Sequence, residues 1–204
     1  MVSIIAVANQ KGGVGKTTTT VNLAASIAKR GYKVLIVDID PQGNATSGLG
    51  IEKSTIEYDV YNVLIDEIPI ASAIKKTTSK NLDIVPATIN LAGAETELIS
   101  MMARETRLKG AVDDLGDAYD FIFIDCPPSL GQLSINAFTA SHSILIPVQS
   151  EYYAMEGLSQ LLNTVRLVQK HFNKDLGVEG VLLTMLDART NLGADVVQQV
   201  REYF

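Results

Sequence analysis

The sequence predicts an α/β fold in which a mostly parallel, twisted sheet is flanked by helices. Short apolar runs rich in β-branched residues recur along the chain, and longer segments of helical period separate them. A glycine-rich loop joins the first apolar run to the first helical segment. Runs this apolar are typical of strands buried on both faces and joined by right-handed crossovers. We therefore expect ligands at the carboxyl edge of the sheet.

The predicted elements follow from this alternation. Strands are expected over residues 4–7, 34–37, 82–85, 121–124, 143–148 and 181–183, and helices over 17–30, 131–140, 152–172 and 194–203. The third of these helices has an apolar stripe, typical of a helix packed on a core, formed by Leu158, Leu161, Leu162, Val165 and Val168. The less regular stretch 43–80 is expected to be an excursion from the sheet.

Composition bounds the class of protein. The chain has 204 residues, of which 47% are hydrophobic and 20% charged, so a single domain over residues 1–204 can bury about 70% of its unfolded surface. This excludes a disordered or collagen-like chain. The longest uncharged apolar runs are far shorter than the roughly 20 residues that span a bilayer. The amino terminus shows no secretory signal, so a cytoplasmic location is expected.

Charge and cysteine content narrow the possible partners. The single cysteine, Cys126, has no intramolecular disulfide partner, and the two histidines lie far apart in a sequence without a zinc-binding pattern. The net charge of −6 argues against a surface that is basic all over. Any nucleic-acid binding therefore needs a local basic patch, or an oligomer that assembles one.

The loop after the first strand has the composition of a phosphate-binding loop. Residues 9–18 read NQKGGVGKTT and lead into a helical segment. The loop residues Gly12, Gly13, Val14 and Gly15 let backbone N–H groups turn toward a polyphosphate at the positive end of the helix. The lysine at position 16, Lys16, reaches the β and γ phosphates in such loops, and the hydroxyl of Thr17 binds Mg²⁺. The usual pattern has a further glycine at position 10, where this chain has Gln10, so the loop is a variant.

Two further segments place acids at predicted strand ends. Asp38 and Asp40 close the second strand, and alternation puts them on the same side. Asp125 ends the strand FIFI at 121–124, which is the Walker B arrangement for holding Mg²⁺ directly or through water. An acid that caps a turn at a strand end is a common alternative. Three phosphate-type features in one chain favour a Mg²⁺-dependent nucleoside triphosphatase.

These motifs resemble one family. The strings KGGVGKTT at 11–18, DIDPQGNAT at 38–46 and DCPPS at 125–129 are similar to those of the ParA/MinD family of deviant Walker A ATPases. The runs DPQGNATSGLG at 40–50 and LLTMLDART at 182–190 favour the chromosome-partitioning ParA branch. The resemblance covers essentially all 204 residues and implies a P-loop fold, ATP and Mg²⁺ as cofactors, and hydrolysis of ATP by water.

The resemblance also implies roles for single residues. Lys11 matches the signature lysine that reaches the partner's nucleotide across an ATP-dependent homodimer, and Gly12 matches a glycine that lets the subunits approach. Thr18 completes the nucleotide loop. Asp40 matches the acid that positions the attacking water and lies near the metal. Slow intrinsic turnover is expected, because no separate arginine finger is evident.

The partners implied are nonspecific double-stranded DNA and a ParB-type centromere-binding protein, with no membrane and with a location on the nucleoid. Arg189 matches a position that the family uses to contact DNA phosphates, and a dimer doubles it. Lys170 and Lys174 either contribute or are solvated helix charges. Family members continue past the position of Phe204 with a stretch that completes the adenine pocket, so we expect a shortened chain.

Other readings of the loop stay open. A MinD-type protein associates with membranes through a basic carboxy-terminal amphipathic helix, which the visible sequence lacks. The nitrogenase iron protein needs two cysteines per subunit, which this chain does not have. A biosynthetic ligase or kinase of the dethiobiotin synthetase type transfers the phosphate to a small molecule. A nucleotide-gated DNA binder without catalysis is a further class.

Overall fold

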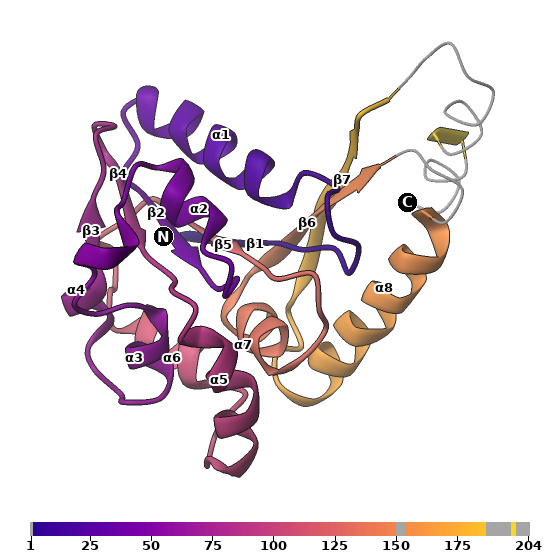
Figure 1. The fold of residues 1–204 in the computed structure, drawn as a ribbon. Coiled ribbons are helices and arrows are strands. Elements are labelled where there is room, and N and C mark those ends of the chain that lie inside the picture. Colours follow the sequence, from indigo (N-terminus) through magenta and orange to yellow (C-terminus); the bar gives the residue numbers. More distant parts are fainter. Residues whose placement is uncertain (1, 150–153, 187–196, 199–204) are drawn as a thin grey trace.

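Seven strands form one sheet through the middle of the molecule (Figure 1). The computed structural model describes residues 2–149, 154–186 and 197–198. The strand order is β3-β4-β2-β5-β1-β6-β7. The strands are β1 (Ser3–Val7), β2 (Val34–Asp38), β3 (Lys75–Lys76), β4 (Leu82–Val85), β5 (Phe121–Asp125), β6 (Ser143–Gln149) and β7 (Gly177–Thr184). All neighbouring pairs are parallel except β3 with β4, which confirms the predicted mostly parallel sheet.

Helices cover both faces of the sheet, as the alternation in sequence predicts (Figure 1). They are α1 (Lys16–Lys29), α2 (Asn44–Gly48), α3 (Val60–Leu64), α4 (Ile70–Ala73), α5 (Leu91–Glu97), α6 (Arg107–Asp113), α7 (Gln132–Ala140) and α8 (Ala154–His171), with 3₁₀ turns η1 (Lys53–Thr55) and η2 (Leu98–Ser100). None of the helices in the described part is long and apolar enough to cross a membrane.

The side chains of the five inner strands, β1, β2, β4, β5 and β6, alternate between two apolar clusters. On β2, Val34 and Ile36 belong to the cluster under α1 and α2, whereas Leu35 and Val37 belong to the larger cluster under α3 and α5 to α8. All four are fully buried. The period-two alternation of a strand with two covered faces explains why these runs contain so few polar residues. The apolar stripe of α8 lies in the larger cluster, as predicted.

The departures from the predicted elements lie where the sequence is mixed. The strand expected over 181–183 begins at Gly177, because an edge strand tolerates residues such as Glu179 and Gly180 that break the apolar run. The excursion over 43–80 contains the short antiparallel strand β3, made of two lysines. Two helices with internal glycines, α5 and α6, were not predicted. Of the helix expected over 194–203, only Val197 and Gln198 are described, and both are helical.

Candidate functional site

The glycine-rich loop lies between the carboxyl end of β1 and the amino end of α1. Gly15 precedes the helix with a φ of 91°, and Gly13 has a φ of 76°. A side chain is strained at both positions, since this region of φ favours glycine. Lys16 is the first residue of α1, is 7% exposed, and its Nζ donates to the carbonyl oxygen of Lys11 at 2.9 Å. Burial lowers the pKa of Lys16, an effect that the nearby Cys126, Asp125 and Asp40 oppose.

A carboxylate lies beneath this loop. Asp125 ends β5, is fully buried, and accepts hydrogen bonds from the hydroxyls of Thr17 at 2.7 Å and Thr20 at 2.9 Å. The two threonines are three residues apart on α1 and so face the same side of the helix. The hydroxyl of Thr17 and the carboxylate of Asp125 are therefore already adjacent. Hard oxygen donors of this kind are the ligands that Mg²⁺ prefers, so this donor set fits the ion.

A second buried carboxylate lies on the adjacent strand. Asp38 ends β2 in register with Asp125 on β5. It accepts the backbone N–H of Thr46 at 2.9 Å, the hydroxyl of Thr46 at 2.8 Å and the N–H of Asp40 at 3.2 Å. The Thr46 hydroxyl accepts in turn from the N–H of Ala87. Asp38 therefore ties the start of α2 to the turn that carries Asp40.

The turn after β2 holds Asp40 at the edge of the site. Asp40 is 7% exposed, and its Oδ1 accepts the N–H of Gln42 at 2.9 Å. The carbonyl of Gln42 accepts from Nζ of Lys53. Gly43 follows in the left-handed region at a φ of 58° and caps α2. β2 ends at Asp38, so Asp40 lies in the turn beyond the strand and not on the strand as predicted, and the two side chains bond to different groups.

The two buried strand-end acids have raised pKa values. Burial, and then the charge of Asp125, raise the pKa of Asp38 to about 7. Burial raises the pKa of Asp125 to about 6, although the Thr17 and Thr20 hydroxyls and the charge of Lys16 lower it. Burial also raises the pKa of the Cys126 thiol, so this side chain stays protonated. Keeping two buried carboxylates ionised is unfavourable for the fold, and a bound cation would stabilise their charged forms.

These shifts predict that the protein without nucleotide and Mg²⁺ loses stability as the pH rises. A raised carboxyl pKa in the fold contributes stability that is present below the ordinary value of 3.8 and is lost as the pH rises through about 6 and 7. We expect the free energy of unfolding in urea to fall by on the order of 3 kcal/mol between pH 5 and pH 8. Asp38→Asn, which does not titrate, should flatten this slope, whereas Asp113→Asn on the surface should not. A wild-type profile that is level or rises over this range would contradict the shifts.

Hydrogen bonds to β6 and β7, which lie far from the glycine loop in the sequence, hold this loop in place. The side chain of Asn9 donates to the carbonyl of Pro147 on β6 at 2.7 Å and accepts the N–H of Lys11 at 2.9 Å. The hydroxyl of Thr184 at the end of β7 donates to the carbonyl of Val14 at 2.8 Å. Asn9 and Thr184 are not predictable from the sequence, since nothing in it links them to partners well over 100 residues away. Thr20 was not predicted either, although its helical spacing from Thr17 indicates it.

The remaining predicted residues lie on the glycine loop, outside the described residues, or at the end of α8. Gly12, Gly13 and Thr18 are exposed on the loop and at the start of α1, and Lys11 is half-buried with its N–H on Asn9. Arg189 lies outside the described residues. Lys170 and Lys174 are exposed, the first in the last turn of α8 and the second just beyond that helix.

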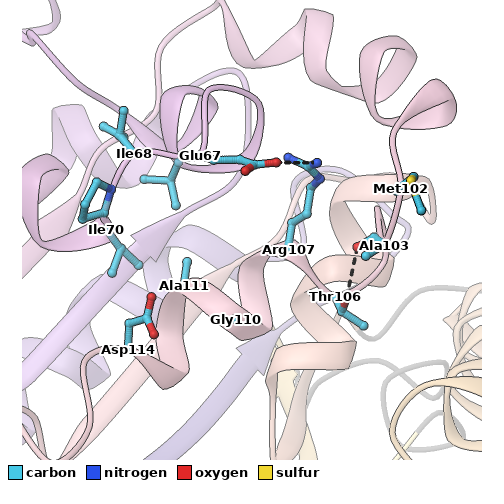
Figure 2. Close-up of a pocket in the computed structure, with 12 residues that line it drawn as sticks. Glu67, Ile68, Ile70, Met102, Ala103, Thr106, Arg107, Gly110, Ala111 and Asp114 are labelled. Atoms are coloured by element: carbon cyan, nitrogen blue, oxygen red, sulfur yellow. Dashed lines mark hydrogen bonds and ion pairs between the residues drawn. The ribbon is translucent and has the colours of Figure 1, made fainter.

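A separate cavity of about 490 Å³ lies between α4 and α6 (Figure 2). Arg107 on α6 pairs with Glu67 at 2.8 Å and donates to the carbonyl of Leu64. The walls near it are formed by side chains such as Ile68 and Ile70. None of the loop or strand-end residues described above lines this cavity, so the chemistry of the site lies elsewhere.

The comparisons with known proteins agree with this geometry. A family model described as an AAA domain matches residues 2–178. The chain is 66% identical over 204 residues to the sporulation initiation inhibitor protein Soj of Bacillus subtilis, covering 100% of this chain and 81% of that protein. It is 53% identical to the chromosome partitioning protein ParA of Myxococcus xanthus, covering 98% and 71%.

A solved structure is similar throughout. The crystal structure of cobyrinic acid a,c-diamide synthase from Mycobacterium smegmatis, with bound ADP and magnesium, superposes with a TM-score of 0.94 at 41% identity, covering 100% of this chain and 83% of that one. The fold and the loop, the family match and the identity to Soj and ParA together show that the chain belongs to the ParA branch of the ParA/MinD family of deviant Walker A ATPases.

Proposed function

We propose that this chain binds ATP with Mg²⁺ and hydrolyses it to ADP and phosphate. The observation that carries the proposal is the pairing of Thr17 with Asp125 at the base of the glycine loop. Both side chains supply oxygen donors at the point where the loop presents Lys16. The ADP and magnesium in the M. smegmatis structure support the same ligands here.

In this proposal different groups of the glycine loop bind the phosphates and the Mg²⁺ ion. Backbone N–H groups of Gly12, Gly13, Val14, Gly15 and Thr18 bind the phosphates, and Lys16 neutralises the β and γ phosphates. Thr17 and Asp125 hold Mg²⁺, with Asp40 close to it; the ion would neutralise phosphate charge there. Lys11 reaches the nucleotide of the partner subunit.

Hydrolysis in this scheme depends on the turn after β2. Asp40 accepts a hydrogen bond from a water molecule and aligns it with the terminal phosphate. Its other oxygen keeps the bond to the N–H of Gln42, which fixes the carboxylate. Positioning and charge neutralisation are the main requirements for phosphoryl transfer to water. Without a partner the turnover is expected to be slow.

At the level of the cell we propose a nucleotide switch in chromosome partitioning. ATP closes a homodimer, the dimer binds double-stranded DNA of any sequence through Arg189, and a ParB-type partner stimulates hydrolysis and release. The protein then works in the cytoplasm on the nucleoid. The names of the relatives from B. subtilis and M. xanthus support this role.

A second candidate is a biosynthetic ligase that uses ATP to activate a carboxyl group of a small molecule. The observation that favours it is the similarity to the M. smegmatis structure, which is named as a cobyrinic acid a,c-diamide synthase. The higher identity to Soj, 66% against 41%, favours the partition switch. The ligase would be favoured if cobyrinic acid with glutamine stimulates ATP turnover and DNA does not change it.

Sedimentation velocity with ATP and Mg²⁺ tests the switch. The wild type is expected to form dimers with ATP, and these dimers should bind a nonspecific DNA duplex. Lys11→Ala should lose the dimer, whereas Arg189→Ala should keep the dimer and lose most of the DNA binding. Lys109→Ala, which removes an exposed lysine paired with Asp113, serves as the control. A wild type that binds ATP yet remains monomeric and does not bind DNA would contradict the switch.

A further inference from the structure

A second polar site lies at the opposite edge of the sheet from the glycine loop. Residues 29–33 read KRGYK and residues 75–80 read KKTTSK, so these eleven residues hold six of the 17 lysines and arginines and no acid. Asn81 joins the two segments, since its side chain donates to the carbonyl of Ala28 and its own carbonyl accepts the N–H of Val34. The end of α1 and the loop before β4 are therefore adjacent (Figure 1).

Three of these cations line one cavity of about 380 Å³, which we call the basic pocket. Lys33, Lys76 and Lys80 face a single carboxylate, Asp83, so the charged lining sums to +2 in a chain of net charge −6. The other residues that line the pocket are Thr77, Ser79, Asn81, Ala118 and Tyr119. The pocket thus has no large aliphatic side chain and several hydrogen-bond donors.

The one carboxylate in the basic pocket already has partners. Asp83 is 7% exposed and accepts from Nζ of Lys76 at 2.7 Å and from the hydroxyl of Tyr119 at 2.8 Å. Burial and the bond to Asp83 raise the pKa of Tyr119, so its hydroxyl remains a donor at neutral pH. Lys76 and Asp83 therefore form an ion pair whose net charge is zero.

The other two lysines of the basic pocket, Lys33 and Lys80, have no such ion pair in the described part of the chain. Within the part of the chain that the structure describes, the ammonium groups of Lys33 and Lys80 make no hydrogen bond or ion pair. The carboxylate of Asp120 accepts the backbone N–H of Lys33 at 2.7 Å and makes no hydrogen bond or ion pair with its ammonium group. Both side chains are exposed and line a cavity whose single carboxylate is already bonded to Lys76 and Tyr119. A bound anion would relieve the repulsion between the two like charges.

We propose that the basic pocket binds phosphate groups through Lys33 and Lys80. Two adjacent phosphodiesters of a nucleic-acid backbone, or one small polyphosphate, supply at least two negative charges and several acceptor oxygens, which match two ammonium groups and the surrounding hydroxyls. The phosphate belongs either to a nucleic-acid backbone or to a small polyphosphate. Lys29 and Arg30 at the end of α1 and Lys75 next to Lys76 on β3 add further positive charges to the same two segments, which suits a chain of phosphates.

The basic pocket is independent of the nucleotide switch proposed above. It lies at the amino ends of β2, β4 and β5, whereas the glycine loop lies at the carboxyl ends of the strands. It is complete within one chain without ATP. Phosphate binding here is therefore expected to persist in a monomer with ADP. If the phosphate belongs to DNA, two lysine contacts bind it measurably only at low salt, so hydrolysis still releases the chain from DNA at physiological salt.

Lysine labelling with mass spectrometry tests the proposal residue by residue. The full chain, saturated with ADP and Mg²⁺, is acetylated briefly at low salt with a 24-base-pair duplex, with tripolyphosphate, or with neither. We expect at least about a threefold lower labelling rate at Lys33 and Lys80 with one of the phosphate probes. Lys109, which pairs with Asp113 on α6, is the internal control.

Affinity measurements complete the test. Lys33→Gln with Lys80→Gln should reduce the slope of log affinity against log salt for the effective probe by about 2, one per lost phosphate contact. Lys109→Gln should leave it unchanged. Protection by the duplex assigns the site to nucleic acid, and protection by tripolyphosphate alone assigns it to a small polyphosphate. No protection with either probe, or equal protection of Lys109, overturns the proposal, whatever the outcome of the ATP-dependent dimer experiment.

Discussion

Asp40→Ala is expected to lower the rate of ATP hydrolysis by at least about 100-fold while leaving ATP binding within a few-fold of the wild type. Asp40 lies outside the glycine loop, so its loss leaves the phosphate contacts of Lys16 and the loop N–H groups in place. In the proposed mechanism, the substitution removes the acceptor that aligns the attacking water. Single-turnover hydrolysis and equilibrium binding of a fluorescent ATP analogue measure the two effects separately.

A matched variant separates chemistry from the shape of the turn. Asp40 accepts the N–H of Gln42 at 2.9 Å. Asp40→Asn keeps an oxygen that can accept this bond but lacks the carboxylate charge. If the acid acts on water, Asn should be nearly as slow as Ala. If Asp40 only holds the turn, Asn should retain most of the wild-type rate, and that outcome would contradict the assigned role. In both variants the ATP-bound dimer is expected to persist longer, because in the proposed switch the dimer is released by hydrolysis.

Gly43→Ala is expected to destabilise the protein by roughly 2–4 kcal/mol. At a φ of 58°, an alanine costs about 1 kcal/mol in backbone conformation alone. A Cβ at this position would also lie 2.6 Å from the carbonyl oxygen of Ala87 and 2.7 Å from Cε of Lys53. The lysine end can move, whereas the Ala87 backbone follows β4 and cannot. Urea denaturation without nucleotide measures the change.

Gly50→Ala is the control for backbone conformation. Gly50 has a φ of 77°, but a Cβ there meets nothing within 4 Å. Its alanine variant should therefore lose only about 1 kcal/mol. Equal losses for the two variants would show that the contact with Ala87 is relieved at no cost. A larger loss at Gly43 should be accompanied by slower hydrolysis, since the same turn carries Asp40 and the N–H of Gly43 bonds to the Asp40 carbonyl.

Local patterns in the sequence predict the central part of the fold. The apolar runs of β1, β2, β4, β5 and β6 have nearly their expected bounds because both faces of these strands are covered. The same holds for α1, whose start is set by the glycine loop. Edge strands lack this signal, because β3 consists of two lysines and β7 includes Glu179. Short helices such as α6 depend on contacts from outside, for example the bond from the Leu108 N–H to the side chain of Asn136.

The candidate site is predictable to the extent that its residues are contiguous. The loop at 11–18 and the strand-end acids Asp38, Asp40 and Asp125 are visible as motifs. The partners that hold them are not, because Thr46 reaches Asp38 by folding back over eight residues and Asn9 reaches Pro147 across 138. Polar contacts at such separations are fixed by strand order, which a single sequence does not specify.

The bonds from Asn9 and Thr184 have a thermodynamic consequence for ligand capture. They attach the loop carbonyl of Val14 and, through the Asn9 side chain, the N–H of Lys11 to the paired strands β6 and β7. A loop held in this way has little conformational freedom left to lose when a polyphosphate arrives. The entropic penalty of ordering a flexible segment is therefore largely met during folding. Affinity for the nucleotide should then respond to changes at Thr184, a residue that contributes no charge and lies on the last described strand.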